Sequence, residues 1–244
     1  MYPGSSMSIF SSIQAAWLTY IGRKESCGIM RDNTAYKAGA FAVVDTETNW
    51  DDEVMSIGVV AADPATMEGI DSRYYIIDPE YRVGGMFANE LRPEEEGVIV
   101  TDRKQALQEI RQWLDTYQVR KLFAYNASFD RNHLPEYRDY EWYDIMRLAA
   151  YRQYNKAIPD CADCYKTGRM KHGYGVENIL RMLSNNSRYK ETHNAVFDAE
   201  DELQIMQLLG RALSEYEIAA VPCRKAGRQT NTNRKGTSLI HKRL

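Results

Sequence analysis

Five side chains that could bind metal ions or move protons lie in three short segments of this chain. Asp45 and Glu47 occur in Val-Val-Asp45-Thr-Glu47-Thr, Asp130 ends Asn-Ala-Ser-Phe-Asp130, and His193 and Asp198 bound His193-Asn-Ala-Val-Phe-Asp198. Carboxylates that converge beside apolar segments repel one another and lose hydration, so bound cations are the usual means of keeping them charged together. Divalent metal binding is therefore the first chemistry that the sequence predicts.

The first three acids follow segments that are typical of buried strands. Asp45 and Glu47 are two residues apart at the end of an expected strand at 41–46, so their side chains leave the sheet on the same side. Asp130 comes a few residues after a second expected strand at 121–124. Because open α/β sheets bind ligands at the carboxyl ends of their strands, we expect these acids to meet at one edge.

Asp198 and His193 lie at the start of an expected helix at 195–213. Asp198 stands at the edge of the apolar stripe of this helix, where it can reach the sheet. The carboxylates can then bind two divalent ions roughly 3.5 to 4 Å apart, as in-line phosphoryl displacement requires. Oxygen ligands favour Mg²⁺ or Mn²⁺. His193, five residues before Asp198, could take a proton from an attacking water.

Hydrophobic periodicity and turn residues predict a mixed sheet with helices packed on it. The expected strands are 41–46, 54–62, 73–77 and 121–124. One expected helix begins at 101 or 102, and three others lie at 128–134, 176–183 and 195–213. Turn signals between the first three strands indicate a meander.

Composition sets the outer limits. The chain has 244 residues, of which 44% are hydrophobic and 27% charged, so one domain with appendages is favoured over two full domains. The net charge of -3 includes the acidic ligands, so local basic segments are a better guide to nucleic-acid binding. No segment is long and apolar enough to span a bilayer, and no basic leader precedes the apolar segment at 9–21. Four cysteines suit a reducing compartment, and we expect a cytoplasmic protein without membrane partners.

The three acidic segments resemble the three motifs of the DEDDh family, the 3′-to-5′ exonucleases of the RNase H-like superfamily. Asp45-Thr-Glu47-Thr resembles the first motif, Asn126-Ala-Ser-Phe-Asp130 the second and His193-x-Ala-x-x-Asp198 the third, in the same order along the chain. The resemblance implies an α/β fold of RNase H-like type, with a mixed sheet flanked by helices, over residues 41–213. It also implies two-metal hydrolysis of DNA or RNA from a 3′ end, most readily a single-stranded one, with release of nucleoside 5′-monophosphates.

The resemblance also implies a role for each motif position. Two Mg²⁺ or Mn²⁺ ions would be held by Asp45, Glu47, Asp130 and Asp198, and the general base would be His193. Residues that would seat the 3′-terminal nucleotide are Thr46, Thr48 and Asn126. Asp144 would support the ligands from behind. In Gly-Gly-Met86-Phe87, the two apolar side chains could form a wedge under the last base or could plug the core.

Alternative interpretations accompany each motif. A lone Asp-x-Glu or His-x₄-Asp is common on protein surfaces, so only the full set is specific. Asn126 could cap the helix that contains Asp130, and Asp198 could pair with an arginine. At the level of function, the alternatives are a nucleic-acid or partner-binding module without turnover and a phosphodiesterase of short oligonucleotides. The completeness of the metal and base set disfavours the binding module.

An insert at 151–175 separates the second motif from the third. Its basic residues alternate with Tyr151, Tyr154, Tyr165 and Tyr174, which suits phosphate attraction and base stacking as well as an ordinary solvated loop. Cys161-Ala-Asp-Cys164 could bind zinc together with His172 and either Cys223 or Cys27, but a single Cys-x-x-Cys pair is a weak signal.

The two ends of the chain form separate segments. Residues 1–40 form an N-terminal extension, in which Ile9, Ile13, Trp17 and Tyr20 could line one face of a short helix. Residues 214–244 form a basic tail, because Arg224 to Leu244 carries seven Lys or Arg residues and no acid. We expect this tail to be flexible and to attract nucleic acid, or to act only as a solubilising segment.

Overall fold

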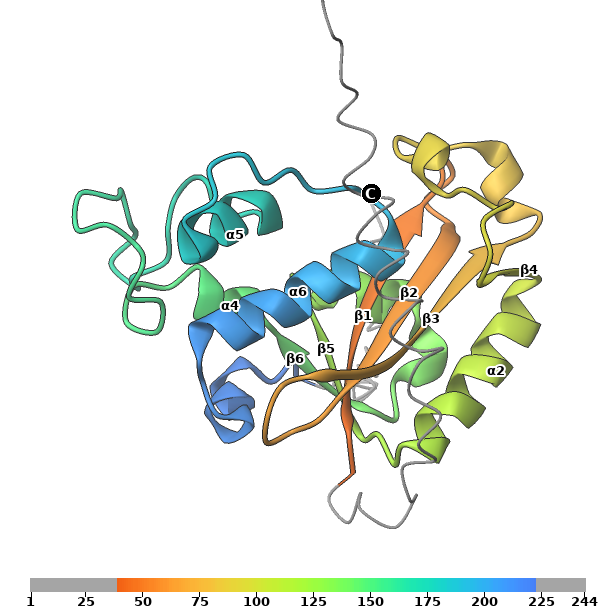
Figure 1. Cartoon of the computed structure of the whole chain (residues 1–244), viewed down its shortest axis with the longest axis horizontal. Coiled ribbons are helices and arrows are strands. Elements are labelled where there is room, and N and C mark those ends of the chain that lie inside the picture. The colour runs from red at the N-terminus through yellow and green to blue at the C-terminus, as the bar shows by residue number, and fades with distance from the viewer. Residues whose placement is uncertain (1–38, 223–244) are drawn as a thin grey trace, which may run out of the picture. The chain divides into compact units, whose positions relative to one another are not determined.

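The structure is a computed structural model and describes residues 39–222 (Figure 1). A six-stranded mixed sheet with the order β4-β3-β2-β1-β5-β6 forms its centre. The strands are β1 (Phe41–Thr48), β2 (Val54–Ala62), β3 (Gly69–Ile77), β4 (Val98–Thr101), β5 (Lys121–Ala124) and β6 (Glu141–Asp144). The first three pair antiparallel as the expected meander, whereas β4, β5 and β6 each run parallel to their neighbour.

Helices connect and cover the strands. The α-helices are α2 (Arg103–Thr116), α3 (Ser128–His133), α4 (Met146–Ala149), α5 (Val176–Ser184) and α6 (Ala195–Leu209). Short 3₁₀ helices follow in the connections: η1 (Glu80–Val83), η2 (Ala88–Glu90), η3 (Pro135–Tyr137) and η4 (Leu213–Ala219). The mixed sheet with flanking helices confirms the predicted fold class.

The alternation of side chains along β1 determines which helix each residue meets. Ala42 and Val44 belong to the hydrophobic core that α2 closes. Phe41 and Val43 belong to the opposite core, which α5 and α6 close. Figure 1 shows α6 lying across the sheet over β1 and β2. Because side chains alternate between faces, the same parity carries the next odd-numbered residues of β1 onto the α6 side.

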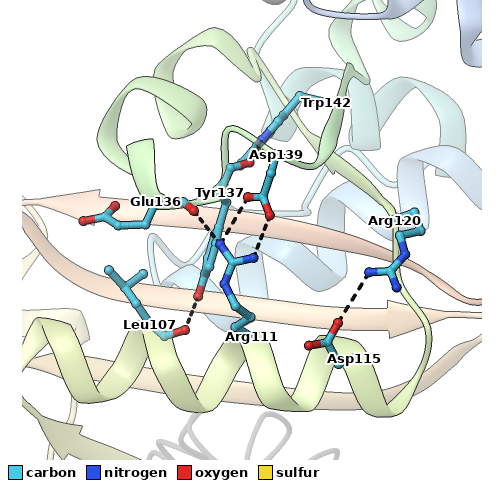
Figure 2. Close-up of polar contacts among 8 residues, drawn as sticks. All are labelled: Leu107, Arg111, Asp115, Arg120, Glu136, Tyr137, Asp139 and Trp142. Carbon is cyan, nitrogen blue, oxygen red and sulfur yellow. Dashed lines mark hydrogen bonds and ion pairs between the residues drawn. The ribbon is translucent and has the colours of Figure 1, made fainter.

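A polar network holds the segment after α3 against α2 (Figure 2). The Arg111 guanidinium donates to both carboxylate oxygens of Asp139, at 2.8 and 3.1 Å, and to the carbonyl of Glu136 at 2.5 Å. The Tyr137 hydroxyl donates to the carbonyl of Leu107 at 2.8 Å. Trp142 on β6 donates to the carbonyl of Tyr137 at 3.0 Å. This network fixes the α3–β6 connection and hence the helix that carries Asp130.

Several element boundaries differ from those that the sequence predicts. The helix expected at 195–213 ends at Leu209, because Gly210 adopts the left-handed conformation at its C-cap, with φ of 60°. Strand β1 continues to Thr48 and β3 begins at Gly69. The four-residue strands β4 and β6 were not predicted, because such short segments carry little periodicity of their own.

The domain also continues past residue 213, where the sequence suggested that the tail begins. Tyr216 in η4 is fully buried, and Val221 donates its N–H to the carbonyl of Trp142 at 2.8 Å. The rest of the predicted tail, the predicted helix at 9–20 and the cysteines at 27 and 223 lie outside the described residues. Within residues 39–222, no helix is long and apolar enough to cross a membrane.

Candidate active site

The carboxyl end of β1 carries the first two acidic residues of the site. Asp45 and Glu47 have the parity of Val43, so they lie on the face of the sheet that α6 covers. Asp45 pairs with Gly58 of β2. A side-chain carbon at Gly58 would lie 2.1 Å from the carbonyl carbon and oxygen of Ala195, so only glycine lets the start of α6 approach this closely. The contact places the first turn of α6 beside β1.

Asp130 reaches the same edge from α3 and is held there by β1. Its Oδ1 accepts hydrogen bonds from the Thr46 N–H at 3.1 Å and from the Thr46 hydroxyl at 2.8 Å. Both residues are buried, at 4% and 2% exposure for Thr46 and Asp130. The donors that we expected Thr46 to offer a nucleotide are thus bonded to Asp130, and in this structure Thr46 positions a metal-ligand candidate.

Asp198 and His193 complete the group from the start of α6. One ligand atom each of Glu47, His193 and Asp198 lie within 4.8 Å of one another, a group of side chains that could hold a metal ion. The Glu47 and Asp198 carboxyls are also close enough to influence each other's pKa. None of the ion pairs found in residues 39–222 includes Asp198, so pairing with an arginine does not account for its position.

Burial and mutual repulsion disfavour the charged forms of these acids. Burial, followed by repulsion from Asp130 and Asp198, raises the pKa of Asp45 well above its ordinary range. Burial raises the pKa of Asp130 to about 7, and burial with repulsion from Glu191 raises the pKa of Glu47 to about 7 and that of Asp198 to about 8. A divalent cation would reverse these shifts by favouring the charged forms.

The donor atoms suit such a cation. Asp45 Oδ2 and Asp198 Oδ1 are buried oxygens that accept no hydrogen bond in the structure. Buried polar atoms without partners are costly and uncommon, so two of them on converging carboxylates indicate a site shaped for an external partner. Oxygen atoms from carboxylates are the ligands that Mg²⁺ and Mn²⁺ prefer, so the residues present fit these ions.

Two further acids, which the sequence did not predict, lie at the site. Glu191 is half-buried, and of the charged neighbours of Glu47 and Asp198 it raises their pKa values the most. Glu202 is 2% exposed, with Oε2 lacking a hydrogen bond, and burial followed by repulsion from Asp45 raises its pKa well above the ordinary range. Helical spacing was an available signal, since Glu202 lies one turn after Asp198 on the same face of α6.

Asn126 and Asp144 are joined behind the ligands. The Asp144 carboxylate accepts hydrogen bonds from the N–H groups of Asn126 at 3.0 Å and Met146 at 3.1 Å. These bonds hold the turn after β5, from which α3 starts. Asn126 does not cap α3, because Ala127 occupies the N-cap position and no side chain bonds to the helix start. The expected contact of Asn126 with a nucleotide stays a prediction.

The Gly-Gly-Met-Phe segment lies against the end of β1. A side-chain carbon at Gly85 would lie 2.7 Å from the carbonyl oxygen of Thr48, so this backbone approaches the strand closely. Met86 is 71% exposed. The Phe87 ring stacks on His193, with centroids 3.9 Å apart and ring planes 16° from parallel. Whether the two apolar residues and Thr48 meet a substrate stays a prediction.

The insert folds into a tied loop on the domain. Isolated bridges join Tyr151 to Arg169 and Cys164 to Met170. The Arg169 guanidinium lies over the rings of Tyr165 and Tyr174, 5.1 and 5.3 Å from their centroids. Arg152, which we grouped with the phosphate-attracting residues, instead donates to the carbonyls of three residues of the loop, namely Pro159, Asp160 and Ala162.

The two cysteines of the insert are free thiols, exposed at Cys161 and half-buried at Cys164. Among residues 39–222, the grouping of His, Cys, Asp and Glu side chains that could hold an ion is Glu47, His193 and Asp198 and includes neither cysteine. The zinc hypothesis therefore gains no support from the described part of the chain.

A solved structure shares the overall fold of this chain. The nuclease domain of 3′hExo, a DEDDh family member bound to rAMP, matches with a TM-score of 0.52, over 76% of this chain and 98% of that chain at 13% identity. The chain has the DEDDh exonuclease fold. A 3′-exonuclease recognising a histone mRNA stem-loop matches with a TM-score of 0.48 at 12% identity, over 85% of this chain and 76% of that chain. Exonuclease I from Methylocaldum szegediense matches with a TM-score of 0.49 at 12% identity, over 73% of this chain and 42% of that chain.

No family model and no curated protein matches the sequence. The DEDDh likeness is thus carried by the fold and by the short motifs rather than by overall identity. At 13% identity, the nuclease domain of 3′hExo shows a shared fold and no more. The identity of the substrate must therefore be argued from this chain's own residues.

Proposed function

We propose that this protein is a metal-dependent 3′-to-5′ exonuclease that hydrolyses phosphodiester bonds of DNA or RNA and releases nucleoside 5′-monophosphates. One observation carries the proposal. Glu47 and Asp198 converge with His193 within 4.8 Å, on the face of the sheet that also receives Asp45, beside the Asp130 carboxylate that β1 holds. The nuclease domain with the same fold was solved with rAMP, a nucleoside monophosphate, which supports the proposed class of product.

The metal ions would be held by Asp45, Glu47, Asp130 and Asp198. Two bound Mg²⁺ or Mn²⁺ ions would supply charge stabilisation at the attacking and leaving oxygens of the phosphoryl group. Thr46 keeps Asp130 directed at this site through two hydrogen bonds. Burial of the Asp130 and Asp198 carboxylates excludes water that would otherwise screen their interaction with a cation.

His193 would accept the proton of the attacking water. Its ring lies beside Glu47 and Asp198 and projects from the residue before the α6 cap, outside the regular helix. A neutral imidazole can accept a proton, and general-base catalysis of this kind contributes typically 10²- to 10⁴-fold in rate. We therefore expect His193→Ala to lower kcat by roughly that factor while the carboxylates still bind metal.

The deciding experiment uses oligonucleotides labelled at either end. Single-stranded DNA and RNA with a 5′ label should yield a ladder that shortens from the 3′ end with Mg²⁺ or Mn²⁺, and EDTA should abolish it. A 3′-phosphate and a closed single-stranded circle should resist. Asp45→Asn and Asp198→Asn should be inactive, whereas Asp160→Asn, which changes an exposed acid of the insert, should be fully active.

Four results would contradict the proposal. Hydrolysis in EDTA would show that metal is not required, and cutting of the circle would show an endonuclease. Tight binding of the oligonucleotides without any product would support the alternative, a binding module. Activity confined to the shortest oligonucleotides would instead indicate a short-oligonucleotide phosphodiesterase with the same site.

A further inference from the structure

The face of the His193 ring is covered by Phe87. The ring centroids lie 3.9 Å apart with planes 16° from parallel, while a nitrogen of the same imidazole lies within 4.8 Å of carboxylate oxygens of Glu47 and Asp198. No base could enter between two rings at this separation. Phe87 therefore contacts the general-base candidate itself, whereas the expected wedge would contact a nucleobase.

Phe87 is held in place by buried residues and by the end of β1. It packs against the small core formed by Met55, Tyr74, Ile76, Leu91 and Ala195. At the start of its segment, the Trp50 N–H donates to the carbonyl of Gly84 at 3.0 Å. The ring that covers His193 thus belongs to a segment anchored to the end of β1 as well as to the core that includes Ala195.

Asn194 ties the other end of this segment to the turn that carries His193. It occupies the N-cap position of α6, where asparagine ordinarily accepts a hydrogen bond from the helix, but its side chain makes no such bond. Its amide donates instead to the carbonyl of Glu90 at 2.7 Å and to the Tyr74 hydroxyl at 3.2 Å. Tyr74 in turn donates to the carbonyl of Leu91 at 3.1 Å.

The local backbone makes such support necessary. His193 has a φ of 58°, in the left-handed region that is uncommon for residues other than glycine, although asparagine, aspartate and histidine adopt it more often than most. It precedes the helix, so the regular hydrogen bonds of α6 do not fix its backbone. Without a contact on its face, the imidazole would be free to rotate between side-chain rotamers.

We propose that Phe87 and Asn194 are positioning residues that hold the His193 imidazole toward the acidic site. The proposal rests on the proposed function, in which this imidazole accepts the proton of the attacking water. Phe87 restricts the plane of the ring, and Asn194 fixes the backbone from which the ring projects relative to the segment that carries Phe87.

Ring-proton NMR of the metal-free protein tests the packing without any activity. The chain has four histidines, and His193→Gln identifies the resonance of interest after histidine labelling. Stacking on Phe87 should shift the His193 ring protons upfield, and Phe87→Leu should remove this shift. Phe87→Tyr, which keeps the aromatic face, should preserve it.

The chain provides a matched control in a second phenylalanine–histidine pair. Phe129 and His133 have ring centroids 4.2 Å apart, so Phe129→Leu should move the His133 resonances and leave those of His193 in place. If Phe87→Leu leaves the His193 shifts unchanged, the two rings do not stack in solution and the proposal is wrong.

A double-mutant cycle separates positioning of the base from contact with substrate. We expect Phe87→Leu to lower kcat by roughly tenfold with little change in KM, since small misplacement of a reacting group can cost up to about 10²-fold. In a His193→Ala background, the same substitution should have no further effect on kcat. An equal loss in both backgrounds, or a loss confined to KM, would overturn the proposal in favour of a substrate wedge.

Substitution of Asn194 distinguishes positioning from a merely structural role. Asn194→Ser provides a helix cap of comparable strength but removes the amide donors to Glu90 and Tyr74. The variant should lower kcat and alter the His193 ring shifts in addition to any loss of thermal stability that removal of the two hydrogen bonds causes, and an unchanged kcat would contradict the proposal. A wild-type protein inactive on every nucleic acid would refute the proposed function, while the NMR comparison would still decide the packing.

Discussion

Asp198→Asn should stabilise the metal-free protein at alkaline pH. Asp198 is 4% exposed, and burial with repulsion from Glu191 and Glu47 raises its pKa from 3.8 to about 8. The folded protein therefore keeps a proton on this carboxyl after the unfolded chain has lost it. Asp198 contributes most to the free energy of unfolding at and below the pKa that it has in the unfolded chain. This contribution falls as pH rises from there to about 8.

The size of the effect follows from the shift. At 1.36 kcal/mol per pKa unit, an ionised Asp198 opposes folding by at most about 6 kcal/mol above pH 8. Asparagine removes the charge but still buries an oxygen, Oδ1, that has no donor in the structure, so we expect about half of this ceiling, roughly 3 kcal/mol. For a domain of this size, that gain corresponds to roughly 6 to 12 °C in Tm.

Thermal unfolding in EDTA between about pH 5 and pH 8.5 measures the effect. This window lies above the range in which acids with lowered pKa values, such as Asp78 and Asp139, lose their stabilising charge. The Tm of the wild type should fall as pH rises across the window. The Tm of Asp198→Asn should fall less, and that of Asp160→Asn should follow the wild type. Mg²⁺ should raise the wild-type Tm at pH 8.5 and have little effect on Asp198→Asn. A wild-type Tm that is constant with pH would refute the reasoning.

Three other predictions address the scaffold and the tail. Gly58→Ala should destabilise the domain in urea by about 3 kcal/mol, because its side-chain carbon would overlap the backbone of Ala195, whereas Gly69→Ala, with neighbours at 3.7 Å, should cost far less. Thr46→Val should lower stability by about 1 to 3 kcal/mol and weaken Mg²⁺ binding by calorimetry, since it removes a hydrogen bond to a buried carboxylate that Thr46→Ser retains. Equal Mg²⁺ affinity in both variants would argue against that role. Truncation after Pro222 should weaken oligonucleotide binding and flatten its dependence on salt in fluorescence anisotropy, if the basic tail contacts phosphates.

Much of the site could be predicted because its information is local. Alternation along β1 determines that Asp45 and Glu47 share a face, and apolar periodicity places Asp198 on the sheet side of its helix. These patterns hold for any strand or helix of that sequence, whatever surrounds it. The motif order and the expected mixed sheet followed from the same kind of evidence and agree with the fold.

Other features depended on contacts between residues far apart in the chain. Thr46 bonds to Asp130 across 84 positions, and Asn194 bonds to the carbonyl of Glu90 across 104. Neither pairing leaves a periodic pattern, because the energy of a hydrogen bond depends on geometry that many distant residues determine together. The stacking of Phe87 on His193 was likewise decided only when the sheet brought two independent segments side by side.

The sequence by itself determined which chemistry this chain can host, since carboxylates and a histidine at strand and helix ends are properties of residue type and spacing. The tertiary structure decided how many acids share the candidate site and which side chain contacts the His193 ring. Glu191 and Glu202 joined the group through folding of the chain around α6. Burial and mutual repulsion, which raise the pKa values of these acids, exist only once the chain is packed, because an unfolded chain leaves each carboxylate in water.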